Sequence, residues 1–420
     1  MTSQTAKRNY WLLSICILSF FLTWSFCFSL YPIWLNQAIG LNGEQTGLVF
    51  SVNAITALLI LPSYGFIQDK LGVRKDLLLV VGALLVCSGP FFIFVYTPLL
   101  LNSFLIGAIV GGLYFGISFS AGVGAVETYI ERIGRTTGFE FGKVRMWGSV
   151  GWAVATFFAG QIFNTSPTLN FILASACACL FIISLLMVST APTSNSPDKK
   201  GTDTQALNFA DVLALSSNRR FWAFTTFVIG VTCLYSVYDQ QFPVYFAAQF
   251  SSKAEGNAMF GYLNSFQVFL EAGGMFVAPF IVNRIGAKNG LLLSGVVMAI
   301  RMIGSGFADD PISISSMKLL HAVELPIMLV AIFKYIVATF DPRLSSTIYL
   351  VGFSFMTQAA ASGLSIVAGI MYDSIGFATS YKIMGGIAAL FVLISACVLT
   401  NDRPKPRDTL PLDTGTPEKT

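Results

Sequence analysis

Three ionisable side chains, Lys318, His321 and Glu324, lie within seven residues of one otherwise apolar stretch. Their spacing of i, i+3 and i+6 places them on one broad face of a helix. His321 is the only histidine of the chain. An ionisable side chain at the centre of a membrane helix costs roughly 2.5–3.5 kcal/mol on insertion scales. We therefore expect these groups to face a watery cavity or charged partners, and to take part in binding or moving a proton.

The composition predicts that this stretch crosses a membrane. Of the 420 residues, 55% are apolar and only 11% are charged, whereas about 25% of the residues of a soluble domain are charged. The apolar segments of about 20 residues suffice for roughly twelve helices. The seven cysteines show neither a CxxC pair nor zinc-type spacing, so no disulfide or metal site is predicted. The net charge of +4, without a basic tract that contains aromatic residues, gives no sign of nucleic-acid binding.

Polar breaks divide the chain into two halves. The pattern predicts a six-helix bundle over residues 1–190, a hydrophilic linker over 191–220, a second six-helix bundle over 221–400, and a charged tail over 401–420. The first apolar run is longer than the apolar core of a signal peptide, so it is expected to be a retained helix. Lysine and arginine concentrate in alternate loops, and the positive-inside rule then places both termini and the linker in the cytoplasm.

A short loop pattern occurs once in each half. Gly65, Asp69 and Gly72 stand at the end of the second predicted helix, and the same spacing recurs at residues 279–286, where Asn283 replaces the carboxylate. The glycines permit a tight turn, and a carboxylate there accepts hydrogen bonds from helix-end N–H groups. An ordinary charged loop is the alternative. The pattern resembles the loop signature of the major facilitator superfamily, which implies a gating loop and two halves that rock around a midplane site.

Other polar residues that do not suit a lipid environment fall inside further predicted helices: Glu127, Arg145, Trp152, Asp239, Glu271 and Arg301. The stretches around them are AGVGAVE at 121–127, FEFGKVR at 139–145, YDQQF at 238–242 and KLLHAVELP at 318–326. Together they resemble the oligosaccharide:proton symporters, the family of lactose, raffinose and sucrose permeases. The resemblance extends from Pro32 to Asp373.

The resemblance implies an all-α membrane protein with twelve transmembrane helices in two pseudo-symmetric six-helix bundles. It also implies a monomeric, proton-coupled symporter of a bacterial-type inner membrane, which imports a disaccharide by alternating access. Its partners would be the sugar, the proton and the lipid bilayer. No cofactor or metal is expected, because the proton gradient drives transport. The chain contains neither HExxH nor GxSxG, which argues against an enzyme.

By the same resemblance, Glu127, Arg145 and Trp152 would bind the sugar from the N-terminal half. A guanidinium and a carboxylate offer donors and acceptors to a polyol, and an indole stacks on the apolar face of a sugar ring. A structural ion pair near the cytoplasm is the alternative for Glu127 and Arg145. A membrane-interface anchor is the alternative for Trp152.

In the C-terminal half, the resemblance implies that Glu324 carries the proton and that Arg301 sets its proton affinity. His321 would connect the sugar and proton sites, although a histidine that is merely satisfied within the core is the alternative. Asp239 and Lys318 would form an interhelical ion pair, whose role is either structural or part of coupling.

Four positions depart from the lactose-type pattern. A second intramembrane Asp–Lys pair is replaced by Ser236 and Thr357, and joint loss is expected because a single unpaired buried charge is costly. The lactose-type coupling glutamate aligns with Val268. Glu271 lies three residues further on, near the same helical face, so it can supply a carboxylate for sugar binding and coupling.

The substrate prediction favours sucrose. The neutral Ser236 and Thr357, Gln68, and the run YLNSFQ at 262–267 are more similar to sucrose permeases. Trp152 is more similar to the galactoside branch, which leaves melibiose, lactose and raffinose as alternatives. A sugar or drug exporter of the same fold, and a sugar sensor without flux, also remain open.

Overall fold

The computed structural model describes residues 3–189, 218–341 and 344–401, and these ranges are almost entirely helical. Most of the predicted linker and the predicted tail lie outside the described residues, as does the side chain of Asp69. Ten of the described helices or helix runs are long and apolar enough to cross a membrane. Residues 76–86 and 88–102 form a further span with a 47° bend. The 25-residue helix Phe141–Thr165 is long enough to cross as well, although it is less apolar, and with it the described residues contain twelve spans.

The N-terminal half contains six spans, several of which are interrupted by short π-helical turns. Its elements are α1 (Ser3–Phe28), α2 (Tyr31–Trp34), η1 (Leu35–Ile39), α3 (Gly43–Leu71), α4 (Asp76–Val86), α5 (Ser88–Pro90), η2 (Phe91–Tyr96), α6 (Thr97–Asn102), α7 (Phe104–Phe115), η3 (Gly116–Ser120), α8 (Ala121–Thr137), α9 (Phe141–Thr165) and α10 (Pro167–Met187).

The C-terminal half begins at Arg219, within the end of the predicted linker, and also has six spans. Its elements are α12 (Arg219–Phe227), η4 (Val228–Cys233), α13 (Leu234–Ala248), α14 (Lys253–Ile285), α15 (Ala287–Phe307), α16 (Pro311–Leu319), α17 (His321–Thr339), α18 (Ser345–Ile348), η6 (Tyr349–Phe355), α19 (Met356–Ile375) and α20 (Phe377–Val398).

Side chains define where several of these helices begin. Asn42 and Gln45 form a capping box at the start of α3, in which each side chain bonds to the backbone of the other. Asp310 caps α16 by accepting from the backbone N–H groups of Ile312 (2.8 Å) and Ser313 (3.0 Å). These hydrogen bonds hold the pKa of the Asp310 carboxyl below its usual range. Local capping therefore fixes helix starts in loops that the hydrophobic pattern leaves undefined.

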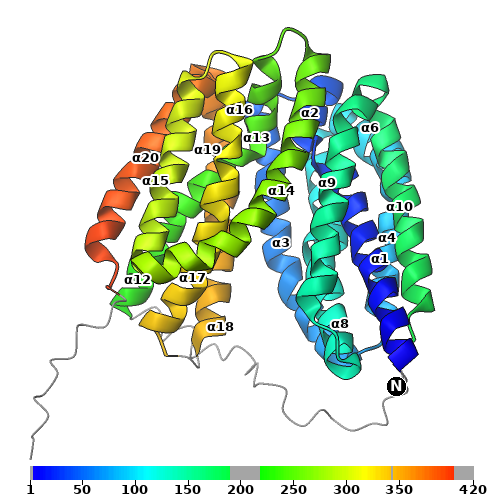
Figure 1. The fold of residues 1–420 in the computed structure, drawn as a ribbon. Helices are drawn as coiled ribbons and strands as arrows, with labels where there is room; N and C mark the ends of the chain where they lie inside the picture. Colours follow the sequence, from blue (N-terminus) through cyan, green and yellow to red (C-terminus); the bar gives the residue numbers. More distant parts are fainter. Residues whose placement is uncertain (1–2, 190–217, 342–343, 402–420) are drawn as a thin grey trace, which may run out of the picture.

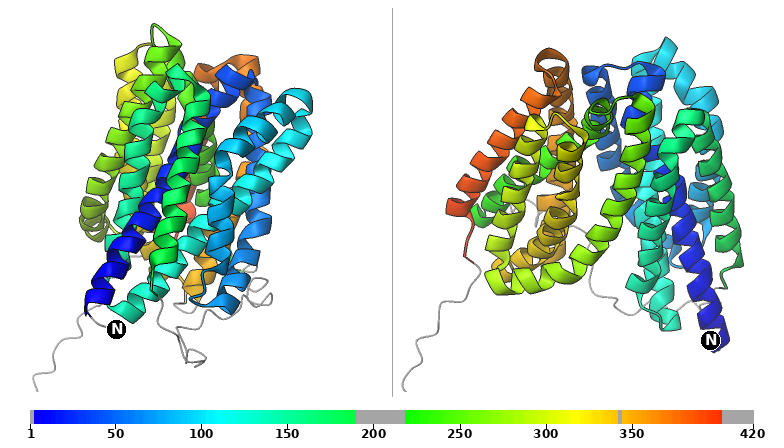
Figure 2. Two further views of the ribbon diagram at one scale, coloured as in Figure 1. Left: turned by 90° about the vertical axis from the view of Figure 1, so that its right-hand side faces the viewer. Right: turned by 45° about the horizontal axis from the view of Figure 1, so that its top comes forward.

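The two halves stand side by side, meeting at one end and separating at the other (Figure 1). The described chain ends, near Ser3 and Asn401, lie at the separated end, and the turned views agree (Figure 2). The helices α3 and α19, and likewise α9 and α14, pack together across the boundary between the halves. The molecule therefore has one closed end and one open end, and its chain ends lie at the open one.

Close packing of helix backbones at small residues seals the closed end. A Cβ atom added to Gly47 on α3 would lie 2.3 Å from the carbonyl oxygen of Ser365 on α19. A Cβ added to Gly160 on α9 would lie 2.2 Å from the carbonyl oxygen of Asn257 on α14. Such contacts exclude any larger side chain, so glycine is required for the helices to approach this closely.

Polar contacts between the halves strengthen this closed end. The Asp373 carboxylate of α19 accepts from the backbone N–H groups of Gly43 and Glu44 at the start of α3, both at 2.8 Å. The amides of Gln37 and Asn257 exchange two hydrogen bonds of 3.1 and 3.0 Å. A carboxylate at a helix N-terminus is favourable, because free N–H groups and the helix dipole both attract it.

The repeated loop pattern lies at the open end in both halves. Gly72 after α3 has φ +59° and Gly286 after α14 has φ +91°, so both turns use conformations that favour glycine. Lys75 donates to the last carbonyls of the α10 segment, including Val188 at 2.6 Å. Lys288 donates in the same way to Leu399 after α20, at 2.8 Å. In each half a lysine at the start of the third span therefore ties the loop to the end of the last span.

The contacts around the proposed gating residues do not by themselves indicate a gating role. The carbonyl groups of Gln68 and Gly72 accept from the Arg132 guanidinium at 2.8 and 3.1 Å. The Arg132 side chain therefore caps the end of α3. A Cβ at Gly65 would meet nothing within 4 Å, so packing in this conformation does not explain the glycine. A gating role for Gly65, Asp69 and Gly72 stays a prediction.

Candidate functional site

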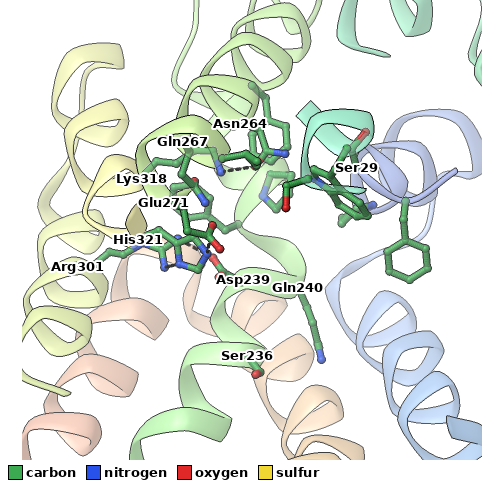
Figure 3. A pocket seen from close by; sticks show the side chains of 18 of the residues that line it. Ser29, Ser236, Asp239, Gln240, Asn264, Gln267, Glu271, Arg301, Lys318 and His321 are labelled. Atoms are coloured by element: carbon green, nitrogen blue, oxygen red, sulfur yellow. Dashed lines mark hydrogen bonds and ion pairs between the residues drawn. The ribbon is translucent and has the colours of Figure 1, made fainter. Parts of the chain in front are cut away.

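A cavity of about 460 Å³ lies between the two halves. The N-terminal half contributes mainly aromatic and small residues to its wall, and the C-terminal half contributes polar ones (Figure 3). The polar and charged residues of the C-terminal wall are Ser236, Asp239, Gln240, Asn264, Gln267, Glu271, Arg301, Lys318 and His321. Five of the residues predicted from the sequence in this half therefore reach one shared cavity.

Arg301 on α15 lies at the centre of the charged cluster and is 1% exposed. Its Nη1 donates to Oε1 of Glu324 and its Nη2 donates to Oδ1 of Asp239, both at 2.7 Å. The rings of Tyr235 and Tyr238 lie 5.5 and 4.9 Å from the guanidinium carbon. The planar fork of arginine serves two carboxylates on two helices, which a single ammonium group does not do.

Glu324 on α17 is fully buried, and only one of its carboxylate oxygens is bonded. Its Oε1 accepts from Arg301 and lies 3.2 Å from Nδ1 of His321. Its Oε2 has no hydrogen-bond partner among the described residues. Buried carboxylate oxygens are rarely left unpartnered, so this oxygen is a suitable place for a proton.

His321 lies between two carboxylates. Its Nδ1 is 3.2 Å from the buried Glu324, and its Nε2 is 4.0 Å from Oε2 of Glu271 on the cavity wall. The hydroxyl oxygen of Tyr235 lies 2.5 Å from Nδ1 of His321. Because an imidazole can both accept and donate a proton, this arrangement joins the cavity surface to the buried carboxylate.

Lys318 is buried, and its ammonium group forms no ion pair with the Asp239 carboxylate, which pairs with Arg301 instead. Its ammonium donates to Oδ1 of Asn264 at 3.0 Å, and Nδ2 of Asn264 donates to Oγ1 of Thr156 on α9 at 3.1 Å. The predicted direct pair of Asp239 and Lys318 is thus not formed in this conformation. Instead, Arg301 pairs with Oδ1 of Asp239, and Lys318 has an amide oxygen as its partner.

Glu127 on α8 and Arg145 on α9 form an ion pair with each other, and about a third of each side chain is exposed. Neither side chain lines the cavity. The Arg145 guanidinium lies over the ring of Phe21, 4.5 Å from its centroid, and Phe21 does line the cavity. The pair is therefore next to the cavity in this conformation, and its contact with a sugar stays a prediction.

Trp152 on α9 lines the cavity from the N-terminal half. Its backbone carbonyl accepts from Oγ of Ser25 at 3.0 Å, and its ring meets Trp24 edge to face at 5.7 Å. These contacts hold the indole within the protein, which does not fit a membrane-interface anchor. An indole held in this way presents a surface on which an apolar sugar face can stack.

The departures from the lactose-type pattern also lie at this site. Ser236, Val268 and Glu271 all line the cavity. The carbonyl oxygen of Thr357 contacts Sγ of Cys233, one turn before Ser236, at 3.6 Å. The neutral replacements therefore lie where α13 faces α19, and the shifted carboxylate of Glu271 does face His321. Whether Glu271 replaces the lactose-type glutamate stays a prediction.

Several contributors were not predicted. Asn264 and Gln267 precede Glu271 at spacings of seven and four residues, and this polar stripe on an apolar helix was a signal that the sequence contained. Tyr235 carried no such signal, because a tyrosine in an apolar helix is ordinary. Within residues 3–189, 218–341 and 344–401, no group of three or more His, Cys, Asp or Glu side chains has the geometry to hold a metal ion.

Solved structures confirm the fold. The nucleoside transporter NupG superposes with a TM-score of 0.80 at 16% identity, covering 93% of this chain and 98% of that one. A D-xylose-proton symporter superposes with a TM-score of 0.66 at 15% identity, covering 94% and 98%. With the twelve helices in two halves, these similarities confirm the predicted all-α fold of the major facilitator type.

Relatives of similar sequence are permeases rather than enzymes. The melibiose permease of Enterobacter cloacae is 42% identical over 94% of this chain and 93% of its own length. The sucrose permease of Escherichia coli is 41% identical over 91% and 92%, and the raffinose permease of Escherichia coli is 40% identical over 96% and 95%. The family model of the LacY proton/sugar symporter matches residues 2–408. This multi-pass membrane transporter therefore belongs to the LacY family of proton/sugar symporters.

Proposed function

We propose that this protein imports a disaccharide together with a proton, by alternating access across a bacterial inner membrane. The observation that carries the proposal is the shared cavity, which places Trp152 of one half opposite the Glu271, His321 and Arg301 cluster of the other. The family assignment supports sugar transport. No cofactor is required in this proposal, and a single chain contains the whole pathway.

Sugar binding would link the two halves. Trp152 offers a stacking surface, while Glu271 and His321 offer acceptors and donors to hydroxyl groups. Arg145, which pairs with Glu127, packs on the ring of Phe21 at the cavity wall. A small rearrangement there would bring both paired side chains to the sugar. A ligand that contacts both halves favours the conformations in which the halves are closest, and this preference drives the transition.

The charges of the cluster support coupling to one proton. When the carboxylates of Asp239, Glu271 and Glu324 are all ionised they give −3, and the charged forms of Arg301 and Lys318 give +2, so this form of the cluster has a net charge of −1. One added proton makes the cluster neutral. The unpartnered Oε2 of Glu324 is the proposed place for that proton, and His321 would connect it to the cavity.

The conformation fits an inward-facing state. The separated end carries the described chain ends (Figure 1), which the positive-inside rule places in the cytoplasm. The closed end would then face the outside. Sugar and proton would leave toward the cytoplasm from this state, and the empty protein would return to open outward.

Sucrose is the favoured substrate. The neutral Ser236 and Thr357, and the run at 262–267, are more similar to sucrose permeases, while Trp152 supports the galactoside alternative. The relatives that transport melibiose, sucrose and raffinose by name are 40–42% identical to this chain, so identity does not separate these sugars.

Alkalinisation of a weakly buffered medium, on adding sucrose, melibiose, lactose or raffinose to cells that express the protein, tests substrate and coupling together. Glu324→Ala should abolish uphill accumulation but preserve exchange of sugar between the two sides, because the sugar contacts remain. Glu255→Ala, which removes an exposed carboxylate of α14, is the matched control. Uphill accumulation by Glu324→Ala would reject the proton assignment, and no alkalinisation with any of the four sugars would reject the proposed function.

A further inference from the structure

Two buried side-chain oxygens at the cavity have no hydrogen-bond partner among the described residues: Oε1 of Gln267 and Oγ of Ser29. Both residues line the cavity, and they are 5% and 7% exposed. Buried polar groups in native proteins are nearly always bonded. An unpartnered pair on the wall of a ligand cavity therefore points to partners that a ligand supplies.

Gln267 belongs to a polar stripe on α14. Asn264 and Glu271 lie three residues before and four residues after it, so all three share one helical face. The amide of Asn264 is already engaged, because it accepts from Lys318 and donates to Thr156. Gln267 is thus the member of the stripe whose amide oxygen is available. One turn of about 5.4 Å separates it from the level of Glu271, toward the closed end.

Ser29 belongs to the opposite wall and to the other half. It lies in the break between α1 and α2, where its backbone N–H donates to Ser25 at 2.9 Å and its hydroxyl stays unpaired. In Figure 3 its side chain lies across the cavity from Gln267. A ligand between these two walls would therefore contact one residue of each half.

We propose that Gln267 and Ser29 bind hydroxyl groups of the sugar and determine which disaccharide is accepted. The inference rests on the proposed function and names two further contacts at the same site. A sugar hydroxyl both donates and accepts, so it can satisfy an amide oxygen and a serine hydroxyl alike. The cavity volume of about 460 Å³ lies within the range of about 300–1,000 Å³ that is usual for small-molecule sites.

The position of Gln267 indicates how it would discriminate between sugars. A ring bound beside Glu271 and His321 leaves the second ring near the level of Gln267, where disaccharides differ from one another. A sugar without a hydroxyl at that place leaves the buried amide oxygen unpaired. Sites of this kind reject the analogue that lacks the group more strongly than apolar pockets do.

The test uses full-length purified protein and its affinities for sucrose, melibiose, lactose and raffinose, and for monodeoxy derivatives of whichever binds best. Gln267→Met keeps the side-chain length but removes the amide, and should weaken the best sugar about 2- to 10-fold, the usual range for one neutral hydrogen bond. At least one monodeoxy derivative should bind the wild type more weakly than the parent sugar does. That derivative and the parent sugar should bind Gln267→Met equally well. Ser29→Ala should show the same pattern with a different hydroxyl.

Gln249→Met, in the loop between α13 and α14, is the matched control and should leave all affinities unchanged. Retained exchange of sugar across the membrane would show that each variant is folded. Absence of sugar-dependent alkalinisation in the wild type would reject the proposed function itself. If the wild type transports sugar but both variants keep its affinities, its ranking of the four sugars and its response to every monodeoxy derivative, the inference is overturned.

Discussion

Replacing Arg301 by lysine tests whether one guanidinium must serve two carboxylates. In the structure Nη1 and Nη2 each donate at 2.7 Å, one to Glu324 and the other to Asp239. An ammonium group retains the charge but does not span both acceptors. Arg301→Lys should therefore leave one of the two carboxylates without its charged donor.

The size of the effect follows from the contact that is lost. A hydrogen bond to a charged group contributes about 1.5–3 kcal/mol, which is about a 10- to 150-fold change in an equilibrium constant. Because Glu324 is 0% exposed and Arg301 is 1% exposed, water does not replace the donor that Glu324 loses, whereas the Asp239 side chain is 31% exposed and water can reach it. The orphaned carboxylate should instead hold a proton before sugar arrives, so sugar would no longer bring a proton with it.

The assay compares three quantities in proteoliposomes: sugar exchange, uphill sugar accumulation, and proton uptake on adding sugar. Arg301→Lys should retain exchange but lose most accumulation and most sugar-dependent proton uptake. Arg220→Lys is the control, because among the described residues that exposed guanidinium makes one long contact, 3.4 Å to the carbonyl of Thr339. Wild-type accumulation and proton uptake in Arg301→Lys would refute the reasoning.

Two further predictions concern the N-terminal half. Arg145→Lys should lower sugar affinity about 10-fold, because lysine lacks the planar two-point contact; binding measurements with Arg74→Lys as a surface control check this, and unchanged affinity would remove Arg145 from the site. Gly47→Ala should hinder closure of the outer end, because its Cβ would lie 2.3 Å from the Ser365 carbonyl oxygen. Ala38 lines a second, smaller cavity at the closed end, next to Gln37 and Asn257. A cysteine introduced there by Ala38→Cys should then react faster with a thiol reagent, whereas Gly124→Ala, whose Cβ meets nothing within 4 Å, should not change the rate.

The sequence predicted the fold because lipid imposes a simple rule. Apolar segments of about 20 residues must be helices, and loop charges orient them. Roughly twelve spans therefore followed from composition, and their division into two halves followed from the polar breaks. The chemistry of the C-terminal half was predictable for the same reason, since ionisable groups in lipid are costly and therefore functional. The structure brings five of these groups together at the cavity wall or directly behind it: Lys318, His321, Glu324, Arg301 and Asp239.

The pairing within that cluster was less predictable. Which cation binds Asp239 depends on the reach and fork geometry of Arg301 across three helices, and no spacing in the sequence contains that information. The roles of Ser29 and Tyr235 were also hidden, because their residue types are common in membrane helices. A break between α1 and α2, rather than a motif, brings Ser29 to the cavity.

The distribution of groups between the halves suggests why the two solutes would move together. The charged cluster lies in the C-terminal half, while the opposite wall offers Trp152 and small or aromatic residues. Sugar can therefore bridge the halves, whereas a proton cannot. A cavity that closes around sugar loses water, so closing it over a cluster with a net charge of −1 is costly, and one proton removes that charge. With sugar bound, closure would therefore need the proton as well, whereas the empty protein keeps water beside the cluster and would return without either.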